Sequence, residues 1–290
     1  MKKKRRRKKK MNRKIFILTV LIIGLTMFFS VIMIDWKIKV GEQSKFGKVY
    51  AYEPHTLPFQ AEVNKWKPSD LPRSYLDDLR YFAALKLQQN DDSYVKISTL
   101  GSSVTEGAGA SDPRKKWSTL LFKYIKEQDE LFRFDLTVNG FGGYNTREIL
   151  EDDKVELVIS QQPNLILFET CMLNDHGEGL SIQESLNNIT KIVNKFHKEL
   201  PDAKVVLMSP NPKGLEQDVP NKLGLYMDDY NSEIKKYIHK QGWNYIDIYG
   251  SFKKEYKHKI DSVLTDGVHP NDFGYQFWFE KLVKEFQKMR

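Results

Sequence analysis

The sequence predicts an α/β fold in which helices cover both faces of a parallel sheet, preceded by one transmembrane helix. Two observations predict this arrangement. Beyond residue 90, short apolar segments alternate with longer amphipathic ones, as strands and helices do in such folds. Residues 15–34 are twenty residues without a charged side chain, and they follow directly on a basic tail.

The N-terminal segment is predicted to anchor the chain in a membrane. Residues 1–14 contain eleven Lys or Arg and no acidic residue, so the formal net charge of +8 resides in this tail and gives no reason to expect a nucleic-acid partner. As a helix, residues 15–34 span about 30 Å, the thickness of a bilayer core. Because the cations precede this helix, we expect a cytoplasmic N-terminus, an anchor in contact with membrane lipid and an extracytoplasmic main domain.

The predicted organisation has four parts. These are a basic cytoplasmic tail (1–14), a transmembrane helix (15–34), an extracytoplasmic stalk with a leading helix (35–90) and the main domain (91–290). A cleaved signal peptide is the alternative interpretation of the apolar segment, but its end lacks the small-residue cleavage site of such peptides. The single cysteine, Cys171, excludes an internal disulfide.

Each element of the main domain follows from its local pattern. Strands are predicted where six or seven residues rich in apolar side chains lie between turn residues: 94–100, 133–138, 164–169, 204–209 and 243–248. Helices are predicted where apolar residues recur at helical spacing: 69–89, 117–128, 146–160, 181–200, 229–240 and 272–288. Ser181 with Glu184, and Asn145 with Glu148, have the spacing of a capping box.

Polar or glycine-rich segments lie where the predicted strands end. They are residues 101–103, 138–146, 170–177 and, before the last helix, 264–275. In parallel α/β sheets ligands bind beyond the carboxyl ends of the strands. We therefore expect these four segments to meet at one edge of the sheet and to form the functional site.

The four segments contain the groups that acyl transfer from an ester requires. This reaction needs a nucleophile, a base, a group that orients the base, and donors for the oxyanion. Ser103 is the predicted nucleophile, His269 the base and Asp266 the carboxylate that fixes the imidazole. The predicted oxyanion hole consists of the backbone N–H groups of Ser103 and Gly140 and the side-chain amide of Asn174.

In their order and approximate spacing, the segments resemble the four sequence blocks of the SGNH hydrolases, also called GDSL-type esterases. The resemblance matches Ser103, rather than Ser102, to the serine of block I, although Ser102 stands where the family has aspartate. It matches Gly140 to the glycine of block II, a position for which Gly142 and Gly143 compete.

The other two blocks complete the resemblance, which covers about residues 94–286. Block III matches Asn174 followed by Asp175, and block V, Asp-x-x-His, matches Asp266 and His269. The resemblance implies a flavodoxin-like three-layer α/β/α sandwich with a five-stranded parallel sheet, and catalysis without a metal or cofactor. The chain itself offers no second pair of ligands at the standard spacing of a metal site.

The sequence thus predicts an extracytoplasmic serine esterase that removes small acyl groups, acetyl above all, from cell-envelope or extracellular carbohydrate through an acyl-serine intermediate. Two alternatives stay open, an O-acyltransferase with the same triad and a non-catalytic envelope assembly or binding protein with the same fold. No long apolar segment near the blocks suggests a lipid tunnel, which disfavours a lipase or thioesterase. Residues 211–227 are either a substrate-contacting loop or a surface excursion, and the oligomeric state is left open.

Overall fold

The computed structural model describes residues 74–89, 94–128 and 132–289, which all belong to one compact unit, Val63–Arg290. The predicted tail, transmembrane helix and first part of the stalk, residues 1–73, lie outside the described residues. No helix in the described part of the chain is long and apolar enough to cross a bilayer. The anchor therefore stays a prediction from the sequence.

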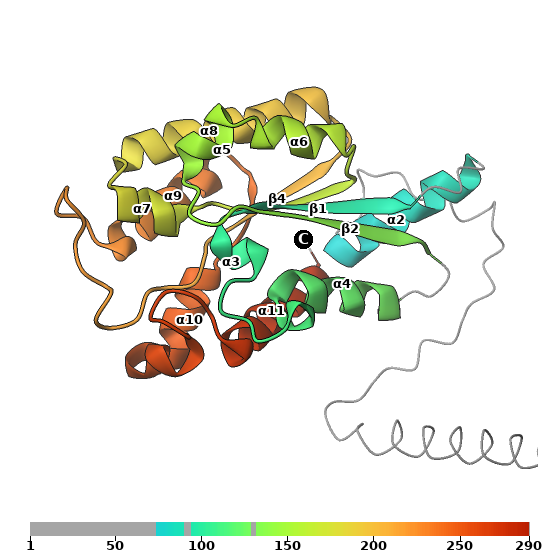
Figure 1. The fold of residues 1–290 in the computed structure, drawn as a ribbon. Helices are drawn as coiled ribbons and strands as arrows, with labels where there is room; N and C mark the ends of the chain where they lie inside the picture. The colour runs from blue at the N-terminus through green and yellow to red at the C-terminus, as the bar shows by residue number, and fades with distance from the viewer. Residues whose placement is uncertain (1–73, 90–93, 129–131, 290) are drawn as a thin grey trace, which may run out of the picture. The chain divides into compact units, whose positions relative to one another are not determined.

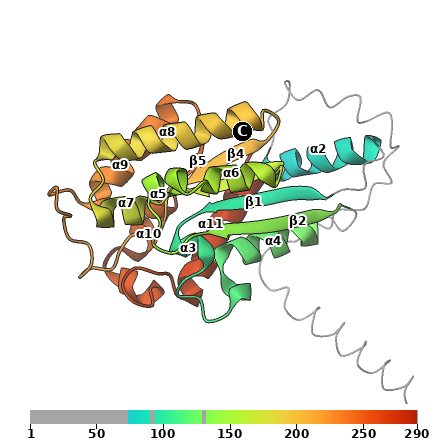
Figure 2. The same cartoon turned by 45° about the horizontal axis from the view of Figure 1, so that its top comes forward.

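A five-stranded parallel sheet forms the centre of the unit (Figures 1 and 2). Its strands are β1 (Val95–Gly101), β2 (Phe134–Gly140), β3 (Leu165–Glu169), β4 (Lys204–Met208) and β5 (Asn244–Ile246). They lie in the order β2-β1-β3-β4-β5, and every neighbouring pair is parallel. The five strands and their parallel arrangement are confirmed, with ends shifted by no more than two residues.

Helices cover both faces of this sheet, as predicted (Figure 1). One layer contains α5 (Thr146–Glu151), α6 (Lys154–Ser160), α7 (Met172–Glu178), α8 (Ile182–Glu199) and α9 (Met227–Lys240). The other contains α2 (Tyr75–Gln88), α4 (Trp117–Gln128), α10 (Ile248–Tyr256) and α11 (Asp272–Gln287). A short helix, α3 (Ser103–Glu106), follows β1 at the carboxyl edge of the sheet.

Aromatic contacts join the helices of the second layer. Trp117 of α4 stacks on Trp278 of α11, with ring centroids 5.7 Å apart and planes 9° from parallel. Tyr75 of α2 packs edge-on against Phe286 of α11 at 5.3 Å. All four side chains are almost completely buried. The leading helix therefore packs on the same body as the last helix of the chain.

One predicted helix, residues 146–160, is two helices in the structure. α5 ends at Glu151 and α6 starts at Lys154, because Asp153 has a φ of +54° that interrupts the helical hydrogen bonds. Aspartate tolerates this left-handed conformation better than most residues. The capping box of Asn145 and Glu148 at the start of α5 is present as predicted.

Candidate active site

The two serines after β1 have different environments. Ser102 is completely buried and donates both its N–H and its hydroxyl to the carboxylate of Glu169, at 2.8 Å each. Ser103 is the first residue of α3 and is partly exposed. Its Oγ lies 3.0 Å from Nε2 of His269. Of the two hydroxyls, that of Ser103 is the one within reach of both an imidazole and a ligand.

His269 lies between the serine and a carboxylate. Its Nδ1 is 2.7 Å from Oδ2 of Asp266, and its Nε2 faces Ser103. Because the carboxylate only accepts, the neutral ring with this contact carries its proton on Nδ1 and has a free lone pair on Nε2. This is the protonation state in which an imidazole removes the proton of a hydroxyl.

The carboxylate and the imidazole come from one tight loop, residues 264–270, called here the acid–base loop. Its two end residues pair in an antiparallel bridge, and the N–H of Thr265 donates to the carbonyl of His269 at 2.8 Å. Gly267 within it has a φ of +79°, which glycine adopts without strain. The loop therefore delivers both side chains to one place, as their three-residue spacing predicts.

Asp266 is ionised at neutral pH. Partial burial opposes ionisation, but the backbone N–H and ring of His269 and the N–H of Val268 donate to the carboxylate and lower the pKa of Asp266 from 3.8 to about 2. The side chain is 53% exposed, so water also solvates the charge. A permanent negative charge beside Nδ1 stabilises the imidazolium that forms when His269 takes a proton.

Two of the predicted oxyanion donors, Ser103 and Asn174, each have an N–H group without an acceptor among the described residues. The backbone N–H of Ser103 lies at the first position of α3, where it lacks an intrahelical acceptor, and no other described residue accepts from it. Asn174 of α7 donates one amide hydrogen to the carbonyl of Tyr144 at 2.8 Å. Its second amide hydrogen has no acceptor within the described part of the chain.

The third predicted donor, the N–H of Gly140, is less well placed. Phe141 donates its N–H to Gly101 of β1, and consecutive N–H groups of a strand point in opposite directions, so that of Gly140 points away from β1. A Cβ at Gly140 would collide with the backbone of Glu106, which explains a glycine there by close packing alone. Of the two glycines that compete, Gly143 has a φ of +81° and open space around it.

Gly143 is also next to the residue that Asn174 contacts. The amide of Asn174 reaches the carbonyl of Tyr144, which directly follows Gly143. No described residue accepts a hydrogen bond from the N–H of Gly143. These observations favour Gly143 over Gly140 as the second backbone donor of the oxyanion hole.

Glu169 is not among the predicted site residues, yet it contacts the Ser103 turn directly. It is the last residue of β3, is completely buried, and accepts hydrogen bonds from Ser102 and from the N–H of Cys171. The available indication was a charged residue at the end of an otherwise apolar strand. Such a residue rarely becomes buried without a specific partner.

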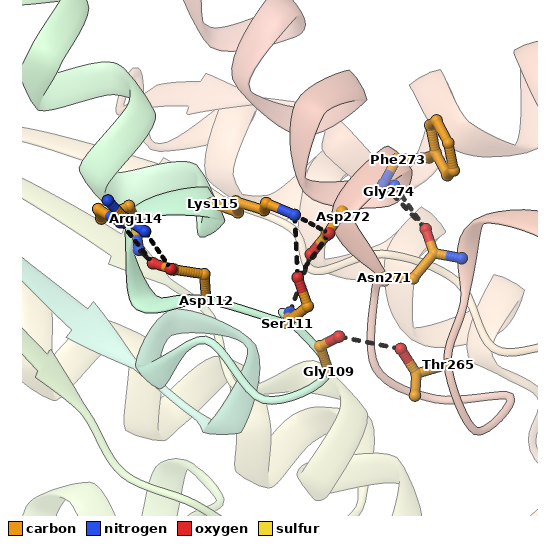
Figure 3. Close-up of polar contacts among 10 residues, drawn as sticks. All are labelled: Gly109, Ser111, Asp112, Arg114, Lys115, Thr265, Asn271, Asp272, Phe273 and Gly274. Atoms are coloured by element: carbon orange, nitrogen blue, oxygen red, sulfur yellow. Dashed lines mark hydrogen bonds and ion pairs between the residues drawn. The ribbon is translucent and has the colours of Figure 1, made fainter.

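Polar contacts join the segment after α3 to the acid–base loop and the start of α11 (Figure 3). Asp272 accepts from the N–H and the hydroxyl of Ser111 at 2.9 and 2.7 Å, and from Nζ of Lys115 at 2.5 Å. The hydroxyl of Thr265 donates to the carbonyl of Gly109 at 3.0 Å. The segments that carry the serine and the histidine are thus bonded to each other beyond the catalytic side chains.

The first residues of the 211–227 insertion also contact the acid–base loop. Asn211 is buried and donates to the carbonyl of Val268 at 2.7 Å, and the N–H of Gly214 donates to the carbonyl of Gly267 at 2.7 Å. This part of the insertion therefore supports the loop.

The acidic and histidine residues near Asn174 bond to other protein groups. Asp175 binds the N–H and hydroxyl of Thr146, while the ring of His176 bonds to Lys213 and to the carbonyl of Leu225. No group of three or more potential metal ligands occurs in the described ranges.

A hydroxyl, an imidazole and an ionised carboxylate bonded in series at the carboxyl edge of a parallel sheet define the class, an α/β serine hydrolase. Residues 99–277 match the GDSL-like Lipase/Acylhydrolase family, and the chain belongs to this family. The resemblance seen in the sequence blocks is thereby confirmed, and the chain is a serine hydrolase that acts on ester bonds.

Several solved structures have a similar fold. Axe2, an acetylxylan esterase from Geobacillus stearothermophilus, is 18% identical with a TM-score of 0.56, and the match covers 68% of this chain and 95% of that one. AlAXEase, an acetyl xylan esterase, is 21% identical with a TM-score of 0.55, covering 66% and 98%.

A member of the lipolytic protein G-D-S-L family from Veillonella parvula DSM 2008 is 18% identical with a TM-score of 0.53, covering 67% and 98%. At these identities the likeness concerns the fold alone. No curated protein matches the chain in sequence.

Proposed function

We propose that this chain is a membrane-tethered, extracytoplasmic esterase that removes small acyl groups, acetyl above all, from cell-envelope or extracellular carbohydrate. The observation that carries the ester chemistry is the 3.0 Å contact between Oγ of Ser103 and Nε2 of His269. The apolar segment 15–34 and its basic flank support the location. This location and the likeness in fold to acetylxylan esterases support the substrate class.

In the acylation step, Nε2 of His269 takes the hydroxyl proton of Ser103 while Oγ attacks the ester carbonyl carbon. The carbonyl π electrons move to its oxygen, which accepts hydrogen bonds from the Ser103 N–H and the Asn174 amide. The intermediate then collapses. The bond to the sugar oxygen breaks, that oxygen takes the proton from the imidazolium, and an acyl-serine remains.

In the deacylation step, water takes the place of the sugar. His269 removes a proton from the water as its oxygen attacks the acyl carbon, and the same donors stabilise the second oxyanion. The bond to Oγ breaks, Ser103 regains its proton from the imidazolium, and the free acid leaves. A sugar hydroxyl in place of water would make the same site a transferase.

The test is hydrolysis and serine labelling by the purified chain. With p-nitrophenyl acetate and acetylated xylooligosaccharides we expect turnover, and with a fluorophosphonate we expect one labelled serine. Ser103→Ala should abolish the label and lower kcat by about 10⁴-fold or more. Ser118→Ala is the matched control, because Ser118 is buried in α4 and its hydroxyl has no partner in the described structure.

The same assay separates the alternatives. Free acetate identifies a hydrolase, and acetyl transferred to an added glycan identifies a transferase. A folded chain that neither turns over esters nor becomes labelled would contradict the proposal and favour a binding protein. Faster cleavage of p-nitrophenyl palmitate than of the acetate would contradict the preference for small acyl groups.

A further inference from the structure

The carboxyl group of Glu169 is buried between two segments of the candidate site. Its Oε2 accepts the N–H and the hydroxyl of Ser102, each at 2.8 Å, and has a longer contact of 3.4 Å with the hydroxyl of Thr105. Its Oε1 accepts the N–H of Cys171 at 2.8 Å. One side chain thus contacts the turn that carries Ser103 and the residue that directly precedes α7.

The backbone around Glu169 is shaped to admit this carboxylate. Leu100 of β1 lies opposite Phe168 of β3, so the next residues along, Gly101 and Glu169, are neighbours at the ends of the two strands. A Cβ at Gly101 would lie 2.7 Å from Oε2 of Glu169 and collide with Thr105. The glycine therefore leaves the space that the carboxylate occupies.

The hydrogen bonds of Glu169 account for a carboxylate in a fully buried position. Burial raises the pKa of Glu169 above its ordinary value, and the bonds from Ser102, Cys171 and Thr105 offset this effect only in part. Backbone N–H groups can only donate, and one of them points at each carboxylate oxygen, so the ionised form satisfies both. All the polar partners of this side chain belong to two segments of the site, within the described part of the chain.

The contact with Cys171 bears on Asn174. Cys171 precedes α7 with a φ of +53°, a conformation that residues other than glycine rarely adopt. Its carbonyl accepts the N–H of Asn174 at 3.0 Å. The bond from Cys171 to Glu169 therefore stabilises the turn that sets the direction of α7, and with it the position of the Asn174 amide.

We propose that Glu169 is a positioning residue of the active site, which keeps the Ser103 turn and the Asn174 helix in register through one buried carboxylate. It acts through these two segments and does not touch the substrate. The inference rests on the proposed function, because it matters to catalysis if Ser103 attacks and Asn174 stabilises the oxyanion. Misplacement of these groups weakens binding of the transition state more than binding of the substrate.

The first test is Glu169→Gln, which keeps the shape but replaces one accepting oxygen by a donor. One of the two segments then loses its acceptor. Per labelled active site, we expect kcat on p-nitrophenyl acetate to fall about 10- to 100-fold while KM changes less than about twofold. The rate of fluorophosphonate labelling should fall in parallel with kcat.

Gln161→Ala provides the matched control. Gln161 joins Ser98 in the middle of β1 to Asn139, through bonds of 2.7 and 2.8 Å, so its loss also leaves polar groups unpaired near the sheet. We expect a lower Tm for this variant and an unchanged kcat per labelled site. An equal loss of kcat in both variants would reduce Glu169 to a structural role and overturn the inference.

Amide hydrogen exchange tests the inference without reference to activity. In Glu169→Gln, exchange should accelerate in residues 101–106, in residues 171–175, or in both, while Gln161→Ala leaves both segments as in the wild type. An inactive, unlabelled wild type with this exchange pattern would refute the proposed function alone. An active wild type with unchanged kcat and exchange in Glu169→Gln would refute the inference alone.

A second variant covers the case in which Glu169→Gln does not fold. Ser102→Ala removes one hydrogen bond to the carboxylate and leaves the contact with Cys171 in place. We expect a smaller decrease in kcat, about three- to tenfold, at unchanged KM. A kcat within twofold of the wild type in this variant would then overturn the inference.

Discussion

At the scale of single residues, burial distinguishes two adjacent serines that are chemically alike. Both hydroxyls have an ionisable neighbour, Glu169 for Ser102 and His269 for Ser103. Ser102 is completely buried, so no ester carbonyl can reach its Oγ, whereas Ser103 is partly exposed. The candidate nucleophile is therefore decided by access as well as by the presence of a base.

The lowered pKa of Asp266 predicts how one contact responds to acid. Its folded value of about 2 lies below the ordinary 3.8, so the contribution to stability is complete above about pH 4 and is lost as the pH falls through 2. We expect the free energy of unfolding to fall more between pH 5 and pH 2.5 in the wild type than in Asp266→Asn, measured with urea. An equal decrease in both proteins would contradict a specific role of this carboxylate.

At the scale of elements, α3 is stable only through its neighbours, because four residues are too few for an independent helix. The hydroxyl of Tyr275 shares its hydrogen between the carbonyl of Ala108, just beyond α3, at 2.7 Å and that of Val104, within α3, at 3.2 Å. The ring N–H of Trp117 also donates to Val104 at 3.2 Å. The two helices that supply these side chains, α4 and α11, thus position the serine that α3 begins with.

The Ser111–Asp272 contact joins the start of α11 to the segment after α3 (Figure 3). In Asp272→Asn, the bonds from Ser111 and Lys115 lose their charged acceptor, and the serine and histidine segments become less firmly joined. We expect kcat to fall about two- to tenfold with KM unchanged, since partly exposed charge pairs contribute little individually. Steady-state kinetics on p-nitrophenyl acetate measures the effect.

A matched carboxylate lies close by in the same view (Figure 3). Asp112 pairs with Arg114 two residues along the chain and has no bond to the acid–base loop. Asp112→Asn should therefore leave kcat as in the wild type. The idea that the Asp272 contact couples the two segments fails if both variants lose the same activity.

At the scale of the whole molecule, the described unit contains every candidate catalytic group, while the predicted anchor precedes it. We expect the full chain to sediment with membranes and to resist carbonate extraction, and the chain without residues 1–34 to appear in the supernatant with unchanged kcat per labelled site. Protease added outside intact cells should degrade the main domain. A full chain that carbonate releases, or a protected main domain, would contradict the predicted topology.

Local pattern was sufficient for much of this protein. Alternating apolar and amphipathic segments predicted the parallel sheet, because the spacing of apolar residues within a segment indicates which of its side chains are buried. The Asp-x-x-His spacing predicted that Asp266 and His269 share a loop, since three residues of separation leave them little freedom to diverge. Short helices such as α3 and α7 escaped prediction because they are too brief to show a period.

Tertiary structure alone decided the rest. Glu169 and Ser102 are 67 residues apart in the chain, and Ser111 and Asp272 are 161 apart. Neither contact can therefore be recognised from a local sequence pattern. The choice between Gly140 and Gly143 as the second backbone donor of the oxyanion hole likewise depends on the direction of each N–H group, which the backbone at and beyond the end of β2 sets. The sequence by itself determined which residue types the site contains and roughly where they come, because these follow from local periodicity and spacing. Their distances, their protonation and their supporting contacts arise from packing between segments remote in the chain, which no local pattern encodes.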